Sequence, residues 1–211
     1  MATPARKDTK SAIMDSAETL MANHGIDGVS LREILRDAVA NPAALNYHFH
    51  SKDGLIQAIL NRRGQGIRTR RLELLRASEA MDTTPTVTDL VDAVINPLLE
   101  FLHEEGEPGR IFLCFLARLQ SDRKGMIQQI ESETFPEMST YMTRALAAAC
   151  SDLSKKERSA RFHMVLDTMY QSLANAGVMA KDWNGKNHAR ALDEYVSRLK
   201  RFLVGGLSAP G

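Results

Sequence analysis

The sequence is poor in cysteine and has no long apolar run, and both shortages exclude classes of protein. Its 211 residues include two cysteines, Cys114 and Cys150, which lie far apart and form no CxxC or Cys/His spacing. A disulfide-rich fold or a zinc site is therefore not indicated. We expect two reduced, buried side chains, since free cysteine behaves as a small hydrophobe. A disulfide or a reactive thiol is the alternative.

No segment approaches the roughly 20 apolar residues that cross a bilayer. The first ten residues, MATPARKDTK, lack the apolar region of a signal peptide. We therefore expect a cytoplasmic protein without a membrane partner. Hydrophobic residues still make up 44% of the chain, enough for a sizeable core.

Positive and negative charges nearly cancel, to a net charge of +1, but they are unevenly distributed along the chain. Residues 1–80 hold 12 Lys+Arg and 9 Asp+Glu, a balance of +3. Residues 81–211 hold 15 and 17, a balance of −2. A basic N-terminal part is a weak indication of a polyanionic partner at that end.

Helical spacing of apolar residues dominates the chain, and strict alternation is scarce, which predicts an all-α fold of about nine helices. A first helix should run from residue 8 or 9 to 24 and end at Gly25. Ser30 and Glu33 form a capping-box pattern for a short second helix. Asn41 and Pro42 suit the start of an equally short third helix. The last helix should run from about 187 to 204 and end at Gly205.

Two short helices separated by a tight turn indicate a helix-turn-helix, whose second helix enters the DNA major groove. Ala43 and Ala44 keep that helix thin, while Asn46 and Tyr47 bring groups that reach bases and phosphates. Phe49 should close the core beneath it. We expect no metal site at His48 and His50, because this spacing on a helix points the rings apart.

The segment IMDSAETLMANHGIDGVSLREILRDAVANPAALNYHFHSKDGLIQAIL resembles the N-terminal domain of the TetR family of bacterial transcriptional regulators. The strongest piece is NYHFHSKDGL. The resemblance implies a three-helix DNA-binding domain over residues 1–50, a connecting helix over about 51–77, and a helical ligand-binding and dimerisation domain over 78–211. It also implies a basic arm at Arg6, Lys7 and Lys10. The DNA contacts that it implies are Ser30, Arg32, Asn41, Ala43, Ala44, Asn46, Tyr47, His48 and Lys52.

One residue departs from the family pattern. The turn between the second and third helices usually carries glycine, and this chain has Val39 there. A β-branched residue with positive φ is strained. Either this turn avoids the left-handed region or it stores strain.

The apolar segment IFLCFLARL, residues 111–119, should be buried. It forms either plain bundle core or the wall of a ligand pocket. A buried Arg118 would need an anionic partner, from the protein or from a ligand. Methionines suit an irregular apolar ligand. The predicted pocket residues are Phe112, Phe115, Arg118, Met164, Met169 and Tyr170.

The resemblance implies a homodimer formed through the last two helices, whose apolar stripes would otherwise be exposed. The expected function is a ligand-responsive regulator, a repressor, that binds a palindromic double-stranded operator and is released by a small apolar or amphipathic effector. Gly64 and Gly66 would make the long fourth helix more flexible between the DNA-binding helices and the effector site.

Two other functions stay open at this point. One is a DNA-binding dimer without an effector. The other is a helical enzyme or carrier using Cys114, His163 or Asp167, although no catalytic arrangement or phosphate-binding glycine loop is visible. We therefore assign no catalytic residue, no metal ligand and no cofactor. The arginines expected mostly on a solvated face are Arg62, Arg63, Arg68, Arg70, Arg71 and Arg76.

Overall fold

The structure, a computed structural model, describes residues 8–80, 84–179 and 188–210. All regular structure in these ranges is helical, which confirms the all-α prediction, with ten helices rather than about nine. They are α1 (Thr9–His24), α2 (Leu31–Asp37), α3 (Pro42–His48), α4 (Lys52–Ala80), α5 (Val87–Glu105), α6 (Glu107–Asp122), α7 (Met126–Thr134), α8 (Pro136–Ala149), α9 (Lys155–Met179) and α10 (His188–Ser208). None of these helices is both long and apolar enough to cross a membrane.

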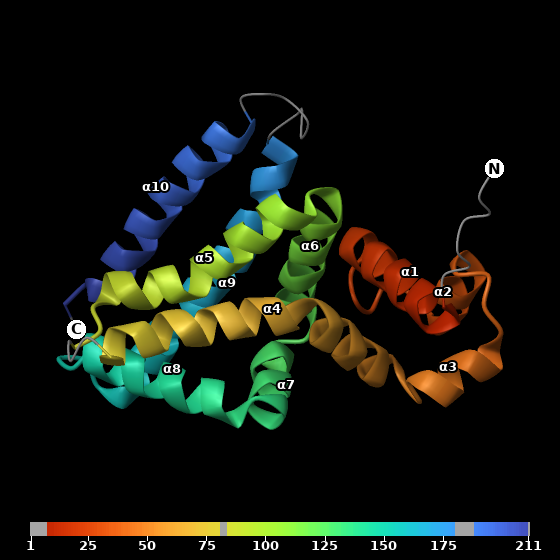
Figure 1. Ribbon diagram of the computed structural model, residues 1–211, viewed down its shortest axis with the longest axis horizontal. Helices are drawn as coiled ribbons and strands as arrows, with labels where there is room; N and C mark the ends of the chain where they lie inside the picture. The colour runs from red at the N-terminus through yellow and green to blue at the C-terminus, as the bar shows by residue number, and fades with distance from the viewer. Residues whose placement is uncertain (1–7, 81–83, 180–187, 211) are drawn as a thin grey trace.

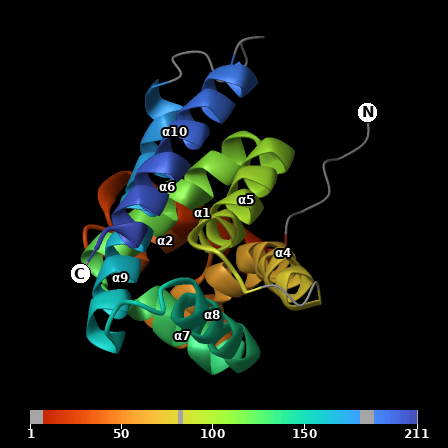
Figure 2. The same ribbon diagram turned by 90° about the vertical axis from the view of Figure 1, so that its left-hand side faces the viewer.

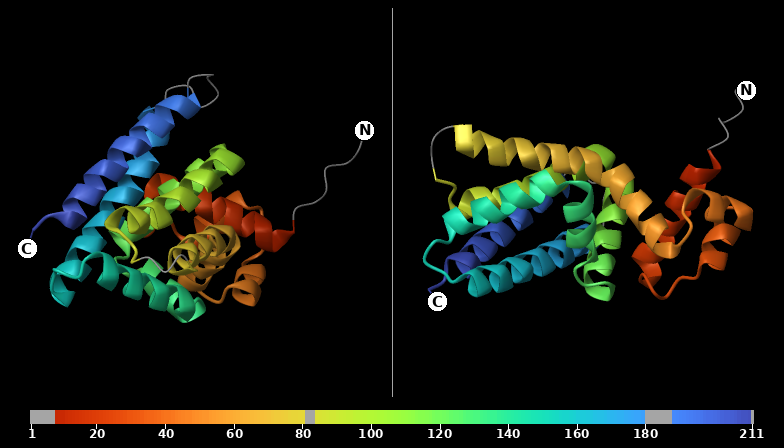
Figure 3. Two further views of the ribbon diagram at one scale, coloured as in Figure 1. Left: turned by 60° about the vertical axis from the view of Figure 1, so that its left-hand side comes forward. Right: turned by 90° about the horizontal axis from the view of Figure 1, so that it is seen from below.

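The small helices α1 to α3 gather at one end of the elongated molecule, and α4 runs from them along its length (Figures 1 and 3). α5 packs against α4, and α6 crosses to meet both α1 and α9. α9 and α10 lie side by side at the opposite edge (Figure 2). The long α4 therefore connects the small N-terminal bundle with the larger helical body.

The predicted helix ends are confirmed in the N-terminal bundle. Gly25 has φ of +83° directly after α1. The Ser30 hydroxyl accepts from the Glu33 amide, and the Glu33 carboxylate accepts from the Ser30 amide, so both halves of the capping box form. The Asn41 side chain accepts from the Ala43 amide at 2.9 Å. Each cap satisfies an amide that a helix start leaves without an intrahelical partner.

Val39 occupies the left-handed region, with φ of +50°. Its amide donates to the Arg36 carbonyl, and the Ala40 amide donates to the Leu35 carbonyl at 2.9 Å. This is the Schellman arrangement, in which glycine is the usual residue at the position of Val39. The side chain is 92% exposed, so no packing compensates the strain. The turn therefore stores strain rather than avoiding the left-handed region.

The expectation of a solvated arginine face on α4 holds only for Arg70 and Arg76, which are exposed, and is wrong for the other four. Arg68 and Arg71 are only 6% and 5% exposed. Arg62 and Arg63 converge on the buried Glu18 of α1, at 3.0 and 3.2 Å. Arg70 pairs with Glu100 and Arg76 with Glu137. All of these except Arg68 thus fasten α4 to neighbouring helices.

Arg68 bonds to its own helix. Its guanidinium donates to the carbonyls of Leu60 and Asn61, two turns earlier, and lies 3.9 Å from the ring centroid of Phe135. A side chain inserted against the backbone in this way bends a helix, and α4 does bend along its course (Figure 3). A Cβ on Gly64 would lie 2.5 Å from Arg68 Nη1. Gly64 thus provides space for this arginine.

The predicted end of the last helix at Gly205 is wrong, since α10 continues through Gly205 and Gly206 to Ser208. Leu207 is 1% exposed. Burial of this side chain outweighs the cost of the two glycines, which is about 1 kcal/mol each in a helix interior. The start predicted at about residue 187 borders a segment outside the described residues.

Candidate functional site

The outer surface of α3 carries polar and aromatic side chains. Asn46 is exposed, Tyr47 is 80% exposed, and Ala43 is exposed one turn earlier. His48 is half-buried, with its ring edge-on to that of Tyr47. Phe49 is 3% exposed, which confirms it as core. α3 therefore presents a narrow surface whose projecting groups are an amide and a phenol.

Three of the predicted DNA contacts are already bonded within the N-terminal bundle. The hydroxyl of Ser30 and the amide oxygen of Asn41 serve as caps. The Lys52 ammonium donates to the Val29 carbonyl at 2.6 Å. An ammonium has three N–H donors, so this bond leaves Lys52 capacity for a further contact. Of the others, Arg32 is exposed and Ala44 is half-buried.

His50, which has no assigned role in the sequence, lies in the turn before α4 with φ of +62°. Histidine is among the few side chains enriched in the left-handed region. Its amide donates to the Leu45 carbonyl, and the turn directs the chain from α3 into α4. In the predicted basic arm, Lys10 is exposed on α1, while Arg6 and Lys7 lie outside the described residues.

The loop after α1 is tied to the far end of α6. The Ile26 amide donates to the Asp122 carboxylate at 2.8 Å. Arg123 donates to both carboxylate oxygens of Asp27, with the shortest distance 2.6 Å. This hydrogen bond from Arg123 holds the pKa of Asp27 below its ordinary value. Two adjacent residues of the larger body therefore fix the position of the N-terminal bundle.

A cavity of about 390 Å³ opens among α4, α5, α7, α8 and α9. This volume lies in the range of small-molecule sites, about 300–1,000 Å³. Its apolar lining consists of Val94, Met138, Met142, Leu146, Ala147, Phe162 and Leu166. Its charged lining consists of Arg71, Glu131, Lys155 and Arg158, and Tyr170 lies beside Arg71.

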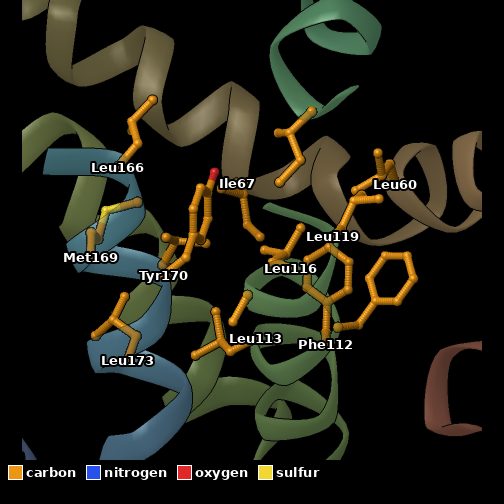
Figure 4. Packing of buried hydrophobic residues seen from close by; sticks show 14 of the residues in the cluster. Leu60, Ile67, Phe112, Leu113, Leu116, Leu119, Leu166, Met169, Tyr170 and Leu173 are labelled. Atoms are coloured by element: carbon orange, nitrogen blue, oxygen red, sulfur yellow. The ribbon is translucent and has the colours of Figure 1, made fainter. Parts of the chain in front are cut away.

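Tyr170 points from α9 toward α4, and its hydroxyl ends close to that helix (Figure 4). It is 4% exposed. Burial raises the pKa of its phenol to about 12, against the opposing effect of Arg71. The hydroxyl therefore keeps its proton at physiological pH and can donate a hydrogen bond.

The predicted pocket residues divide into three groups. Tyr170 lines the cavity, and Phe112 lines a smaller one next to it, between α4 and α6. Phe115 and Met169 are fully buried core residues that border neither cavity. Arg118 and Met164 are exposed, so the expectation of a buried Arg118 is wrong: it lies on the one exposed side of an otherwise buried α6 segment.

Sequence reasoning missed the α8 side chains Met138, Met142 and Leu146, and it missed Arg71. The methionines lie four residues apart, which places them on one face of a helix. Arg71 lies on the same stripe of α4 as Leu60, Ile67 and Leu75, all buried. A charged residue on an apolar stripe was the available signal.

The candidates for enzyme chemistry each bond to a different group. Cys114 Sγ lies 3.9 Å from the Ala174 carbonyl, and burial raises the pKa of its thiol. His163 Nδ1 lies 2.6 Å from the Ser159 carbonyl. Asp167 accepts from Gln120 at 2.7 Å. Both cysteines are free thiols, and no group of His, Cys, Asp and Glu within the described ranges is arranged to hold a metal ion.

One large apolar side chain is exposed on each of α9 and α10. Met164 is 65% exposed and Phe202 is 69% exposed. Elsewhere on these helices, the small residues Ala174 and Ala176 are buried within the subunit. Each of the two helices therefore leaves one large apolar side chain open to solvent.

Comparison with known families identifies the chain. Residues 13–59 match the family described as bacterial regulatory proteins, tetR family. Residues 92–206 match the tetracyclin repressor-like C-terminal domain. The chain belongs to the TetR family. It is a TetR-family transcriptional regulator with a DNA-binding helix-turn-helix in α1 to α3.

Among relatives of this TetR-family chain is the probable HTH-type transcriptional regulator YttP of Bacillus subtilis (strain 168). It is 29% identical over 136 residues, which cover 64% of this chain and 58% of that protein. The match thus spans less than two thirds of the relative.

Two solved structures align with this chain at 16% identity. Salmonella enterica GusR has a TM-score of 0.47 and covers 98% of this chain and 100% of its own. A putative TetR-family regulator from Rhodococcus sp. has a TM-score of 0.49, with 91% and 98% covered.

Proposed function

We propose that this regulator is a repressor that binds a palindromic operator as a homodimer and is released by a small apolar or amphipathic effector. The observation that carries the proposal is the course of α4. Only three residues separate it from α3, and its Arg71 lines the cavity. One helix therefore connects the groups that would meet DNA with those that would meet an effector.

Asn46 would read a base edge, since asparagine pairs with adenine in the major groove. Tyr47, His48 and Lys52 would contact phosphates, with Arg32 nearby. Ala43 and Ala44 would allow close approach, and Ser30 and Asn41 would hold the starts of α2 and α3 against the backbone. Residues 1–50 would thus act as the reading head, α4 as the connecting helix, and residues 78–211 as the effector and dimerisation domain.

Dimerisation would use the outer face of α9 and α10, where Met164 and Phe202 are exposed. Two copies of α3 must lie about 34–36 Å apart to enter successive major grooves. An effector lowers DNA affinity only if it binds more tightly to a state with another spacing. Such a state requires α4 to move relative to the neighbours that its arginines hold.

Selection of bound sequences from a random duplex pool tests the proposal. A palindrome of two half-sites is expected, with affinity that falls steeply as salt rises. Tyr47→Ala or Lys52→Ala should weaken binding to all sequences alike. Asn46→Ala should cost about 1–3 kcal/mol on the preferred site alone. Equal losses on all sequences for Asn46→Ala would contradict base reading.

Sedimentation of Phe202→Glu tests the dimer surface, and a shift to monomer is expected. Tyr47→Glu is the matched control, because it places the same charge on another large exposed side chain, on α3 rather than on α9 or α10. A dimer that survives Phe202→Glu and Met164→Glu together would contradict this surface.

A further inference from the structure

We propose that the cavity takes an amphipathic carboxylic acid, with its carboxylate on Arg71 and its apolar chain along α8 and α9. The inference rests on the proposed role of this cavity as the effector site. It adds the chemical class of the ligand and the residue that selects it.

Arg71 is a buried cation that hydrogen-bonds to the Tyr170 hydroxyl and has two further, long contacts with the protein. It is 5% exposed. Its Nη1 lies 3.5 Å from Glu131 Oε1, and its Nη2 lies 3.5 Å from the Val94 carbonyl. Both distances are at the long limit for hydrogen bonds, and Nε has no partner among the described residues. A buried donor without an acceptor is costly, so an oxygen acceptor entering the cavity would relieve Arg71.

The group that fits best is planar and anionic. Guanidinium forms two parallel hydrogen bonds to a carboxylate, and such charge-assisted bonds are about twice as strong as neutral ones. The Tyr170 hydroxyl, which keeps its proton, is a second donor at the same end of the cavity. The charged lining holds three cations, Arg71, Lys155 and Arg158, against the single carboxylate of Glu131, a balance of +2. The site therefore favours an anion over a neutral or cationic head group.

The remainder of the cavity suits a flexible apolar chain. Met138, Met142 and Leu146 line it from α8, and Phe162 and Leu166 line it from α9. Methionine adapts its shape to an unbranched ligand. At about 30 Å³ for each group the size of a water molecule, 390 Å³ holds about 13 such groups. Decanoate has about twelve heavy groups, ten carbons including that of the carboxylate and two oxygens, and fits within this limit.

The ligand carboxylate would compete with Glu131 for Arg71. Glu131 also attracts Arg68, whose guanidinium bonds across the bend of α4. A carboxylate bound to Arg71 therefore changes the charges around both buried arginines of α4. In this way the head group, rather than the apolar chain, would be read by the helix that leads to α3.

Isothermal titration calorimetry of the full chain with decanoate and with 1-decanol tests whether the cavity prefers a carboxylate head group. Decanoate should bind at least about tenfold more tightly than the alcohol of equal length. Across octanoate, decanoate and dodecanoate, affinity should rise about fourfold per methylene, from about 0.8 kcal/mol each, and stop rising near about 13 heavy groups. Equal affinity for acid and alcohol would overturn the proposal.

The double variant Arg71→Met with Glu131→Gln removes both charges together, so that neither stays buried alone. It should lose the preference for decanoate while still binding 1-decanol. Arg118→Met is the control, since Arg118 is exposed on α6 and lines neither of the two cavities described above. It should keep the wild-type ratio. Loss of the ratio in Arg118→Met, or its survival in the double variant, would place the head group elsewhere and overturn the proposal.

Operator binding, measured on the same protein without ligand, separates the two proposals. Salt-dependent binding to a palindrome with no decanoate binding would leave the regulator in place and refute the ligand class. Decanoate binding that Arg71 controls, without operator binding, would leave the ligand site in place and refute the proposed function.

Discussion

Replacing Val39 with glycine should stabilise the protein. Val39 has φ of +50° in the turn between α2 and α3, and its side chain is 92% exposed. An L-residue in the left-handed region costs about 1–2 kcal/mol, and no packing is lost when this side chain is removed. Glycine offsets part of this gain, because it gives the unfolded chain more conformational freedom, which costs about 0.5–1 kcal/mol. The net gain should be about 0.5–1 kcal/mol.

Thermal unfolding at fixed protein concentration measures this gain, because Tm depends on concentration in an oligomer. For a chain of this length each kcal/mol shifts Tm by about 2–4 °C, so Val39→Gly should raise Tm by about 1–4 °C. Val39→Ala is the control. It removes the β-branch but keeps a Cβ at positive φ, so it should gain less than glycine. A Tm that falls in Val39→Gly, or equal gains for glycine and alanine, would refute strain as the cause.

Three further predictions concern the glycines of α4, the carboxyl of Glu18 and the thiol of Cys114. Gly66→Ala should stabilise α4 by about 0.5–1 kcal/mol through helix propensity. Gly64→Ala should give no gain in the same thermal assay, because the new Cβ would lie 2.5 Å from Arg68 Nη1. A gain in both variants would show that Arg68 moves freely. Burial raises the pKa of Glu18 above 4.5, so the folded state binds this proton more tightly than the unfolded state, and stability should fall as pH rises from 4.5 through the folded pKa. In Glu18→Gln this part of the pH dependence of Tm should vanish. An unchanged pH profile would contradict the prediction. Burial raises the pKa of Cys114, so native protein at pH 7.5 should react with iodoacetamide far more slowly than urea-unfolded protein, and rapid labelling would restore the reactive-thiol alternative.

The local features of the N-terminal bundle follow from the sequence because they depend on neighbouring residues. Ser30 and Glu33 are three residues apart, and Asn41 is two residues from the amide that it caps, so the pattern contains the whole interaction. Phe49 was predicted as core from the usual burial of phenylalanine, and it is 3% exposed. The sequence also located the unusual turn at Val39, although only the backbone angle decides between strain and avoidance.

The cavity was not predictable in the same way. Its lining comes from five helices, and their relative positions depend on contacts between residues far apart in the chain. Arg71 meets Glu131 across 60 positions, and the glycine at 64 has its reason in the side chain of Arg68. Arg118 illustrates the opposite error. An almost wholly apolar segment still has one exposed side, and helical spacing alone does not say which residue occupies it.

The ties from Asp122 and Arg123 to Ile26 and Asp27 bear on how such regulators are recombined. A fragment that ends after α3, or after α4, separates the first loop from its anchors nearly a hundred positions later. A chimera that joins this DNA-binding domain to another effector domain should therefore also carry the last turn of α6 with Asp122 and Arg123. The unit of exchange is a surface contact rather than a contiguous segment of sequence.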